Sequence, residues 1–378
     1  MKSQLSEDVL EFHAATIPGT ESVLCDELRE LGFASVRLNR GGIPFRGSMQ
    51  DGWRACLQSR IAARIQVLLA RFPCRTPDDL YHGVQGIDWR TFLSPSQTLA
   101  VSAVSREDAL AHSGFAALKV KDAIVDQLRQ DIGARPDVDR EDADVRVFAH
   151  VANQKAAVYL DLAGEPLNKR GYRKVAGEAP LRETIAAALL RISGWDRETP
   201  LIDPMCGSGT LAIEAAMWAG NKAPGLLRER FGFERWANYD EEAADALRLL
   251  RGELRGAAKG SMPRVIASDR NADMVEAARQ NARAAGVKLA FRAHDVLVHP
   301  PTGEKGFIIT NPPYGQRLEM APDFPQQLAA VLSRLHGWRS GIMTGGPVYE
   351  QAISAKPLQA IEIPNGGLDC TFLLYDMP

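Results

Sequence analysis

The sequence lacks the features that mark disulfide-rich, metal-binding and membrane proteins. Its five cysteines are scattered, odd in number and form no CxxC pair, and its seven histidines stand at no metal-ligand spacing from them. We therefore expect reduced thiols, no metal site and a cytoplasmic protein. No apolar run approaches the roughly 18 to 20 residues of a membrane span. The stretch from Met1 to Phe12 carries acidic side chains without an apolar core, so we expect no signal peptide.

An excess of positive charge is also missing. The 378 residues contain 45 Lys and Arg against 47 Asp and Glu, which gives a net charge of −2. Proteins that bind nucleic acid often show an overall basic balance, so RNA would have to be contacted here through local patches. A dense basic cluster with an aromatic residue inside it lies in a glycine- and proline-rich stretch: Lys169, Arg170, Tyr172, Arg173 and Lys174. Such a cluster suits phosphates and a stacked base, but a solvated linker has the same composition.

The pattern of the residues changes along the chain, and its length exceeds the usual size of a single core. Up to about residue 163, strands and amphipathic helices follow one another in an α+β pattern without a catalytic constellation. That region includes a helix predicted over roughly 49–69 from its apolar spacing. From residue 181 on, short strands alternate with helices, which predicts a Rossmann-like parallel sheet that ends in an antiparallel hairpin. The stretch 220–262 interrupts this alternation and is interpreted as an insertion.

Acidic side chains follow the first three predicted strands of the second part, and an asparagine follows the fourth. These residues are Asp203, Asp269, Asp295 and Asn311. Ligands of open α/β sheets bind beyond the carboxyl ends of the strands. Three carboxylates do not suit a phosphate, and the loop after Asp203 lacks the Lys-Ser/Thr pair of a P-loop. A cationic ligand with a ribose and an adenine fits this set better, which favours S-adenosylmethionine (SAM) over NAD.

The residues at the first three strand ends are assigned to different parts of the cofactor. Two glycines in the loop after Asp203 allow a ligand to approach the backbone, Asp269 is placed to hold both ribose hydroxyls, and Asp295 to accept from the adenine amine. The gap between Asp203 and Asp269 is longer than the roughly 20 residues of a dinucleotide fingerprint, and the insertion explains it. The predicted cofactor-binding residues are Asp203, Pro204, Cys206, Gly207, Ser208, Gly209, Thr210, Asp269, Arg270, Asn271, Asp295, Val296 and Asn311.

The fourth strand end continues as Asn311-Pro312-Pro313-Tyr314. Two consecutive prolines remove two backbone donors and push the preceding residues into extended geometry. By itself, this stiff loop is either a rigid turn or a site for a flat group with an exocyclic amine. As a site, the Asn311 side-chain oxygen and the Pro312 carbonyl would accept the two amine N–H groups, and Tyr314 would stack on the base. The catalytic candidates are Asn311, Pro312, Pro313 and Tyr314, with methyl transfer by direct in-line displacement to a base turned out of its stack.

The two loop motifs together resemble those of the class I amino-methyltransferases: DPMCGSGT at 203–210 and NPPYG at 311–315. Further stretches extend the resemblance over nearly the full length, among them IDW at 87–89, KRGYR at 169–173 and APLRE at 179–183. The whole chain resembles the RlmL-type 23S ribosomal RNA guanine-N2 methyltransferases that carry an N-terminal THUMP domain. Adenine-N6 methyltransferases share the Asn-Pro-Pro-Tyr motif, so this motif alone does not identify the amine.

The resemblance implies four segments: a ferredoxin-like subdomain (1–68), a THUMP RNA-binding domain (69–163), a basic linker (164–180) and a SAM-dependent methyltransferase domain (181–378). It implies RNA as the partner, with 23S ribosomal RNA favoured and the oligomeric state open. RNA contacts are predicted at Lys119, Lys121, Lys169, Arg170, Tyr172, Arg173, Lys174 and Arg317. In the larger fused members a second methyltransferase domain follows, and because the chain ends at Pro378 we expect that second activity to be absent.

Three alternatives stay open. The same guanine-N2 chemistry on transfer RNA is the nearest, because chains of similar length that join a THUMP and a methyltransferase domain resemble such enzymes. A non-catalytic RNA-binding or ribosome-assembly factor would keep the fold without the reaction. Adenine-N6 methylation of DNA shares the loop motif but not the resemblance of the N-terminal part to an RNA-binding domain.

Overall fold

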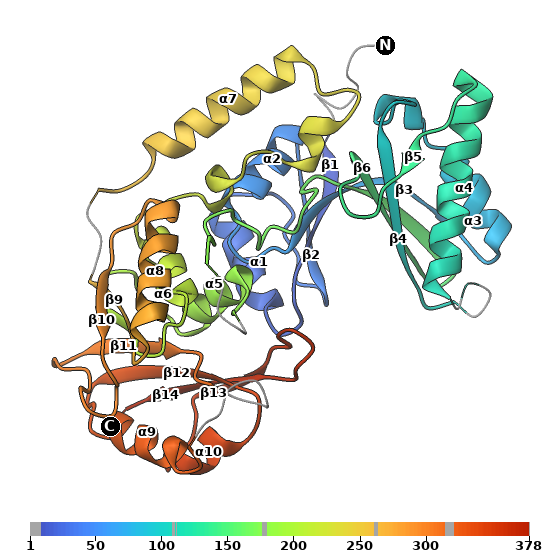
Figure 1. Ribbon diagram of the computed structural model, residues 1–378. Helices are drawn as coiled ribbons and strands as arrows, with labels where there is room; N and C mark the ends of the chain where they lie inside the picture. Colours follow the sequence, from blue (N-terminus) through green and yellow to red (C-terminus); the bar gives the residue numbers. More distant parts are fainter. Residues whose placement is uncertain are drawn as a thin grey trace.

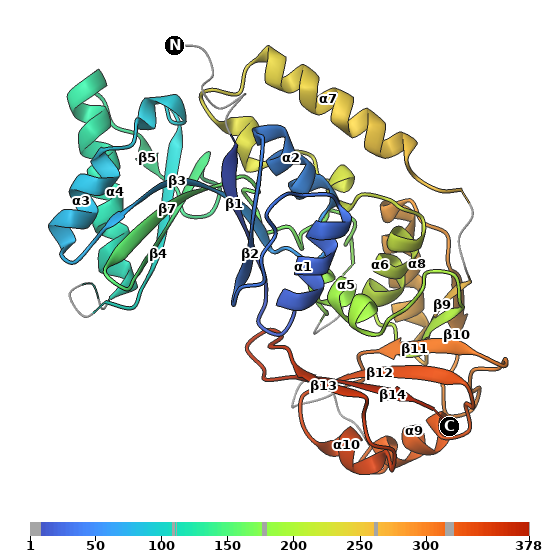
Figure 2. The ribbon, with the colours of Figure 1, turned by 180° about the vertical axis from the view of Figure 1, so that it is seen from behind.

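Two seven-stranded sheets organise the chain in the computed structural model (Figures 1 and 2). The structure describes residues 9–107, 110, 112–175, 180–260, 264–313 and 321–377. Over these ranges, no helix is both long and apolar enough to cross a membrane. The first sheet and its helices are built from the N-terminal part, and the second sheet from residues beyond 200.

The N-terminal sheet is continuous, with the strand order β2-β1-β3-β7-β6-β4-β5. Its long strand β3 pairs with β1 on one side and with β7 on the other. In chain order the strands are β1 (Leu10–Ala15), β2 (Gly42–Gly47), β3 (Arg64–Pro73), β4 (Thr98–Ser105), β5 (Asp137–Val138), β6 (Val145–Ala152) and β7 (Lys155–Asp161). The helices are α1 (Glu21–Glu30), α2 (Met49–Gln58), α3 (Pro77–Gln85) and α4 (Ser113–Ile132).

The helix expected over 49–69 is wrong in its second half. Helix α2 begins at the Ser48–Asp51 capping box and ends at Gln58, and strand β3 begins at Arg64. Ile65 and Val67 are buried on β3, where alternate side chains share a face, so the apolar residues that matched a helical period also match a strand. The predicted boundary at 68/69 falls inside β3, so the proposed ferredoxin-like and THUMP segments share one sheet, and the four-segment division stays a prediction.

The second sheet has the order β10-β9-β8-β11-β12-β14-β13. Its first five strands run parallel, and β14 and β13 are antiparallel, which confirms the predicted sheet with a terminal hairpin. The strands are β8 (Leu201–Asp203), β9 (Val265–Asp269), β10 (Ala290–Ala293), β11 (Gly306–Thr310), β12 (Trp338–Thr344), β13 (Gln359–Glu362) and β14 (Thr371–Asp376). Helices α5 (Glu183–Ile192), α6 (Thr210–Ala219) and α8 (Ala272–Ala285) cover one face, and α9 (Phe324–Leu332) and α10 (Val348–Ala352) lie on the other (Figure 1).

The insertion packs away from the sheet into which it is inserted. It contains the short 3-10 turns η3 (Pro224–Leu227) and η4 (Gly232–Arg235), and the long helix α7 (Glu241–Gly256). In both ribbon views α7 runs beside α2 of the N-terminal part (Figures 1 and 2). The Phe233 ring stacks on Trp53 at a centroid distance of 5.3 Å, and Leu247 and Leu254 are buried in the N-terminal core. The insertion therefore joins the two parts of the molecule through apolar contacts.

We predict that Phe233→Ala destabilises the N-terminal part, although residue 233 follows the first strand of the second sheet. Phe233 is 1% exposed in the N-terminal core, and truncation of a buried aromatic side chain costs about 3 to 5 kcal/mol of unfolding free energy. Urea unfolding gives the total loss, and hydrogen exchange of β1 and β3 locates it. Leu249→Ala on α7 is the control, since Leu249 is 70% exposed. Unchanged exchange in β1 and β3 would contradict the packing described here.

Candidate active site

The parallel pairing of β10, β9, β8 and β11 brings four polar strand ends to one edge of the second sheet. Asp203 ends β8, Asp269 ends β9, and Asn311 follows β11 directly. The chain beyond β10 is held at the same edge, because the backbone N–H of His294 donates to the Asp269 carbonyl at 3.0 Å. Asp295 follows His294. The structure thus brings together the residues that the sequence places at strand ends.

The loop between β8 and α6 is held by backbone hydrogen bonds to the end of β9. Cys206 N donates to the Ser268 carbonyl at 2.9 Å, and Gly207 N donates to Asp269 Oδ2 at 2.9 Å. Gly209 has φ +90, and a Cβ at this position would lie 2.8 Å from the Ala278 Cβ. A glycine is therefore required for both the backbone conformation and the close approach of the loop to α8.

Asp269 has acceptor capacity left for a ligand. Its Oδ2 accepts from Gly207 N and its Oδ1 from Asn271 N at 2.9 Å. Each carboxylate oxygen has two acceptor sites, so both oxygens can still accept from a pair of hydroxyl groups. Asp295 is similar, with Oδ1 accepting from Leu297 N at 2.9 Å. Of the other two predicted cofactor residues near these strand ends, Arg270 is exposed and Val296 is buried.

Asp203 is the buried carboxyl group of the site. It is 2% exposed, and its Oδ1 accepts from the Thr310 hydroxyl at 3.0 Å and from Met205 N at 3.4 Å. Burial raises the pKa of Asp203 to about 7. A cation bound beside it would favour the ionised form. Sequence reasoning missed Thr310, the buried polar residue at the end of β11 that orients this carboxyl group; its position directly before Asn311 is the signal.

Asn311 supplies an acceptor without a partner among the described residues. Its side-chain oxygen Oδ1 is buried and accepts no hydrogen bond from them, and Pro312 next to it is buried. A buried acceptor left without a donor costs roughly 1 to 3 kcal/mol, and a ligand N–H group would remove this cost. Pro313 is half-buried. Tyr314 and Arg317 lie outside the described residues, so their predicted roles are not addressed by the structure.

Cys206 has the wrong environment for a nucleophile. Its side chain is 7% exposed, and burial followed by the negative charges of Asp203 and Asp269 raises the pKa of the thiol well above its usual range. The thiolate, which is the nucleophilic form, is therefore suppressed at neutral pH. In the described ranges, no group of three or more His, Cys, Asp and Glu side chains is arranged to hold a metal ion.

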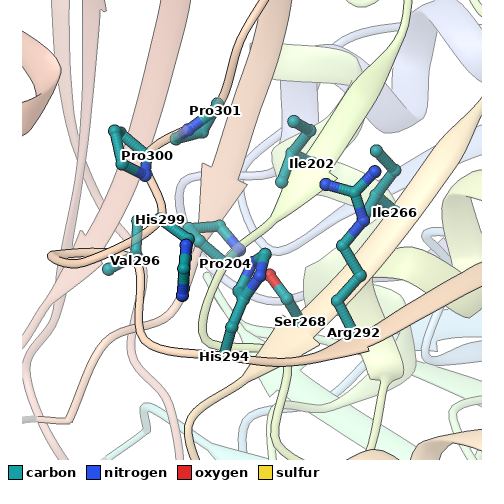
Figure 3. Close-up of a pocket in the computed structure, with 10 residues that line it drawn as sticks. All are labelled: Ile202, Pro204, Ile266, Ser268, Arg292, His294, Val296, His299, Pro300 and Pro301. Atoms are coloured by element: carbon teal, nitrogen blue, oxygen red, sulfur yellow. The ribbon is translucent and has the colours of Figure 1, made fainter.

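A small pocket lies next to the strand ends (Figure 3). Its lining residues come from β8 and the loop after it, from β9, and from β10 and the loop after it: Ile202, Pro204, Ile266, Ser268, Arg292, His294, Val296, His299, Pro300 and Pro301. Pro204 and Ser268 are chain neighbours of Asp203 and Asp269. Ile202 and Ile266 belong to the core on the α9 side of the sheet, whereas Cys206 belongs to the core on the α6 side. The pocket therefore extends the strand-end site to the second face of the sheet.

The structure corrects the predicted RNA contacts in the linker. Arg170 and Tyr172 are 2% and 1% exposed, and both side chains lie against Glu214 of α6, at 3.5 Å and 3.2 Å. The prediction that they contact RNA is wrong, because burial leaves neither the guanidinium nor the ring free. Arg173 is largely enclosed by an ion pair with Glu183 at 2.7 Å. The glycine-rich composition suggested a solvated segment, but two residues of its basic cluster, Arg170 and Tyr172, are buried.

The lysines of the predicted RNA surface remain at the surface. Lys174 is exposed, and Lys169 forms an ion pair with Glu165 at 2.6 Å in which both side chains are more than half exposed. On α4, Lys119 and Lys121 are partly exposed and lie near Asp78 and Asp122. Exposed ion pairs of this kind are weak, so a phosphate can compete for these lysines.

Comparison with known proteins identifies the family of this chain. A family profile described as "RMKL-like, methyltransferase domain" matches residues 170–373, more than half of the chain. This chain belongs to the RMKL-like methyltransferase family. Profiles of a THUMP domain and of an RlmL ferredoxin-like domain match residues 74–161 and 11–66.

Relatives and solved structures extend the similarity of this family member over nearly its whole length. The ribosomal RNA large subunit methyltransferase K/L of Psychromonas ingrahamii is 43% identical over 376 residues, which are 97% of this chain and 50% of that protein. The chain therefore spans about half the length of such curated relatives. Two solved structures are also similar. The structure of a methyltransferase, SMU.472, complexed with SAH has a TM-score of 0.84 and 29% sequence identity, and the match covers 98% of this chain and 99% of that chain. The structure of a predicted N6-adenine-specific DNA methylase from Listeria monocytogenes has a TM-score of 0.85 and 28% sequence identity, and the match covers 98% of this chain and 97% of that chain.

We predict that Asp203→Asn removes a pH dependence of stability. Because the pKa of Asp203 is raised from 3.8 to about 7, the folded state binds the proton more tightly than the unfolded state. The free energy of unfolding therefore falls as the pH rises from about 4 to about 7. Asn cannot ionise, so the free energy of unfolding of Asp203→Asn, measured relative to wild type by urea unfolding, should rise by on the order of 3 kcal/mol between pH 4 and pH 8. Asp26→Asn at an exposed position should follow the wild-type profile; an Asp203→Asn variant that also follows it would refute the prediction.

Proposed function

We propose that this protein transfers a methyl group from SAM to the exocyclic N2 amine of a guanine in large-subunit ribosomal RNA. The observation that carries the proposal is the buried Asn311 Oδ1 at the strand end next to Asp203, an acceptor that no described residue of the chain satisfies. An N–H group of the substrate would satisfy this buried acceptor. The family membership and the relatives named ribosomal RNA methyltransferases support the same conclusion.

SAM would be held along the edge of the second sheet. The free acceptor capacity of Asp269 suits the two ribose hydroxyls, and that of Asp295 suits the adenine amine. Loop 204–209 would lie against the methionine part, and ionised Asp203 would favour the positive sulfonium. The bound cofactor supplies an electrophilic methyl group. The complex of SMU.472 with SAH supports a cofactor of this class.

Asn311 and Pro312 would act on the amine of the target base. An exocyclic amine is a poor nucleophile because its lone pair is conjugated with the ring. If Asn311 Oδ1 and the Pro312 carbonyl accept its two N–H groups, the lone pair is turned out of conjugation and directed toward the methyl group. Two prolines restrict the backbone that carries both acceptors, and the rate enhancement would come largely from positioning. The carbon–nitrogen bond would form as the carbon–sulfur bond breaks, SAH would leave as a neutral thioether, and the methylated nitrogen would release one of its two protons to solvent. No covalent adduct of Cys206 is needed.

RNA is the proposed partner, delivered by the N-terminal part and the surface lysines. The match to a THUMP domain supports this role for the N-terminal sheet. We retain Lys119, Lys121, Lys169 and Lys174 as proposed RNA contacts because they reach the surface. Ribosomal RNA as the substrate would place the reaction in the cytoplasm.

One observation favours a second candidate reaction. The similar chain from Listeria monocytogenes is described as acting on the N6 amine of adenine, and an acceptor pair such as Asn311 and Pro312 fits either exocyclic amine. Incubation with radiolabelled SAM and purified ribosomal RNA, transfer RNA or DNA, followed by digestion to nucleosides, separates these reactions. Label in N2-methylguanosine from ribosomal RNA supports the proposal; label in N6-methyladenosine or in transfer RNA alone overturns it.

We predict that Asn311→Ala abolishes methyl transfer while SAH still binds. The variant loses the acceptor for the amine but keeps Asp269, Asp295 and the glycine loop, so turnover should fall at least about 100-fold with less than a threefold change in the dissociation constant of SAH. Single-turnover transfer and calorimetry measure the two quantities. Asn238→Ala, an exposed position of the insertion, is the matched control. Normal turnover by Asn311→Ala would disprove the role of this side chain.

Lys174→Ala should weaken RNA binding and reduce its salt dependence. A lysine that neutralises one phosphate contributes roughly one unit to the slope of log affinity against log salt concentration. Binding of a ribosomal RNA fragment at several salt concentrations measures this slope. Lys259→Ala, at an exposed lysine near the end of α7, should leave it unchanged. Equal slopes for wild type and Lys174→Ala would remove Lys174 from the RNA surface.

A further inference from the structure

One arginine of the linker, Arg173, contacts the glycine loop. Arg173 donates from Nε and Nη2 to Glu183 Oε1, at 2.9 Å and 2.7 Å, and from Nη2 to the Leu181 carbonyl at 2.9 Å. Its remaining arm, Nη1, donates to the hydroxyl of Ser208 at 3.3 Å. Because Glu183 and Leu181 fix the guanidinium, its Nη1 group is held next to the Ser208 hydroxyl.

Asn281 of α8 holds the same serine from the other side. This side chain is fully buried, and its Nδ2 donates to the Ser208 carbonyl at 3.0 Å and to the Val175 carbonyl at 2.9 Å. Its Oδ1 accepts from Lys174 N at 2.8 Å and from Val175 N at 3.1 Å. Two donor and two acceptor positions are thus all used, which is the full capacity of an amide side chain. One residue therefore joins the linker to the loop.

Ser208 needs such support because of its neighbours. It stands between Gly207 and Gly209, which have φ values of +50 and +90. Glycine adopts many backbone conformations at little cost, so the two glycines do little to fix the position of Ser208 between them. Cys206 N and Gly207 N hold the start of the loop against β9, and Arg173 and Asn281 hold the hydroxyl and the carbonyl of Ser208.

We propose that Arg173 and Asn281 are positioning residues that hold loop 204–209 in the conformation that binds SAM. This inference rests on the proposed function, since it takes SAM as the ligand of the loop. Neither residue needs to touch the cofactor. Arg173 acts through the Ser208 side chain and Asn281 through the Ser208 backbone, so the two contributions can be separated by changing the hydroxyl alone.

The test measures SAH binding by calorimetry and the melting temperature of each variant. Arg173→Gln should weaken SAH binding about tenfold, the effect of losing one hydrogen bond to a charged group. In a Ser208→Ala background, Arg173→Gln should cause no further loss, because its partner is already gone. Asn281→Asp keeps the acceptors but removes both donors, so it should weaken SAH binding in both backgrounds.

Arg339→Gln is the matched control. Arg339 also donates to a carboxylate, Asp376 at 2.6 Å, and to a backbone carbonyl, that of Ser193 at 3.3 Å, but it has no contact with the loop. The Arg339–Asp376 pair is more exposed than the Arg173–Glu183 pair, so Arg339→Gln should lower the melting temperature less. SAH binding weakened by Arg173→Gln but not by Arg339→Gln, together with no further loss from Arg173→Gln in the Ser208→Ala background, separates positioning from general stability.

The outcomes that overturn the inference are specific. Unchanged SAH binding by Arg173→Gln and Asn281→Asp overturns this inference and leaves the proposed function standing. The same follows if Arg173→Gln weakens SAH binding as much in the Ser208→Ala background as it does in the wild type. If Asn281→Asp does not fold, the double-mutant cycle of Arg173→Gln and Ser208→Ala tests the inference without it. A wild-type protein that binds no SAH overturns the proposed function and this inference with it.

Discussion

Parallel pairing in the second sheet is the constraint on which the candidate site depends. Because β10, β9, β8 and β11 run in the same direction, their carboxyl ends lie at one edge, and the residues there share one space. Asp203, Asp269, Asp295 and Asn311 are separated by long stretches of sequence, including the whole insertion. Without this pairing, the carboxylates and the amide would not lie at one edge. The buried Asn311 oxygen and the buried Asp203 carboxyl are polar groups whose cost a ligand can offset.

The linker makes a second set of interactions, which reach the glycine loop. Arg170 and Glu214 form a buried ion pair, and burial raises the pKa of Glu214 in spite of the arginines nearby. Such a pair adds little net stability, but loss of one partner leaves an uncompensated buried charge. The pair therefore fixes where the linker lies. Three residues further on, Arg173 reaches Ser208, so the segment that connects the two sheets also supports the glycine loop.

The insertion shows how the two parts form one molecule. Its residues Phe233, Leu247 and Leu254 are buried in the N-terminal core, and Arg60 of the N-terminal part donates to the Lys222 carbonyl at 2.7 Å. Apolar burial and hydrogen bonds thus join segments that are far apart in the chain. A proposed RNA-binding surface on the first sheet is consequently held at a defined position relative to the strand ends of the second.

The sequence by itself determined the class of the second sheet, the four residues at its strand ends and the glycine loop, because strand and turn signals are local. Tertiary structure decided the rest. Residues 64–69 matched a helical period, yet strand pairing on both sides made them part of β3. Composition gave the linker a solvated, basic character, but burial against Glu214 turned Arg170 and Tyr172 inward. The hydrogen bonds of Thr310 to Asp203 and of Asn281 to Ser208 join distant segments, and only the tertiary structure shows these partners.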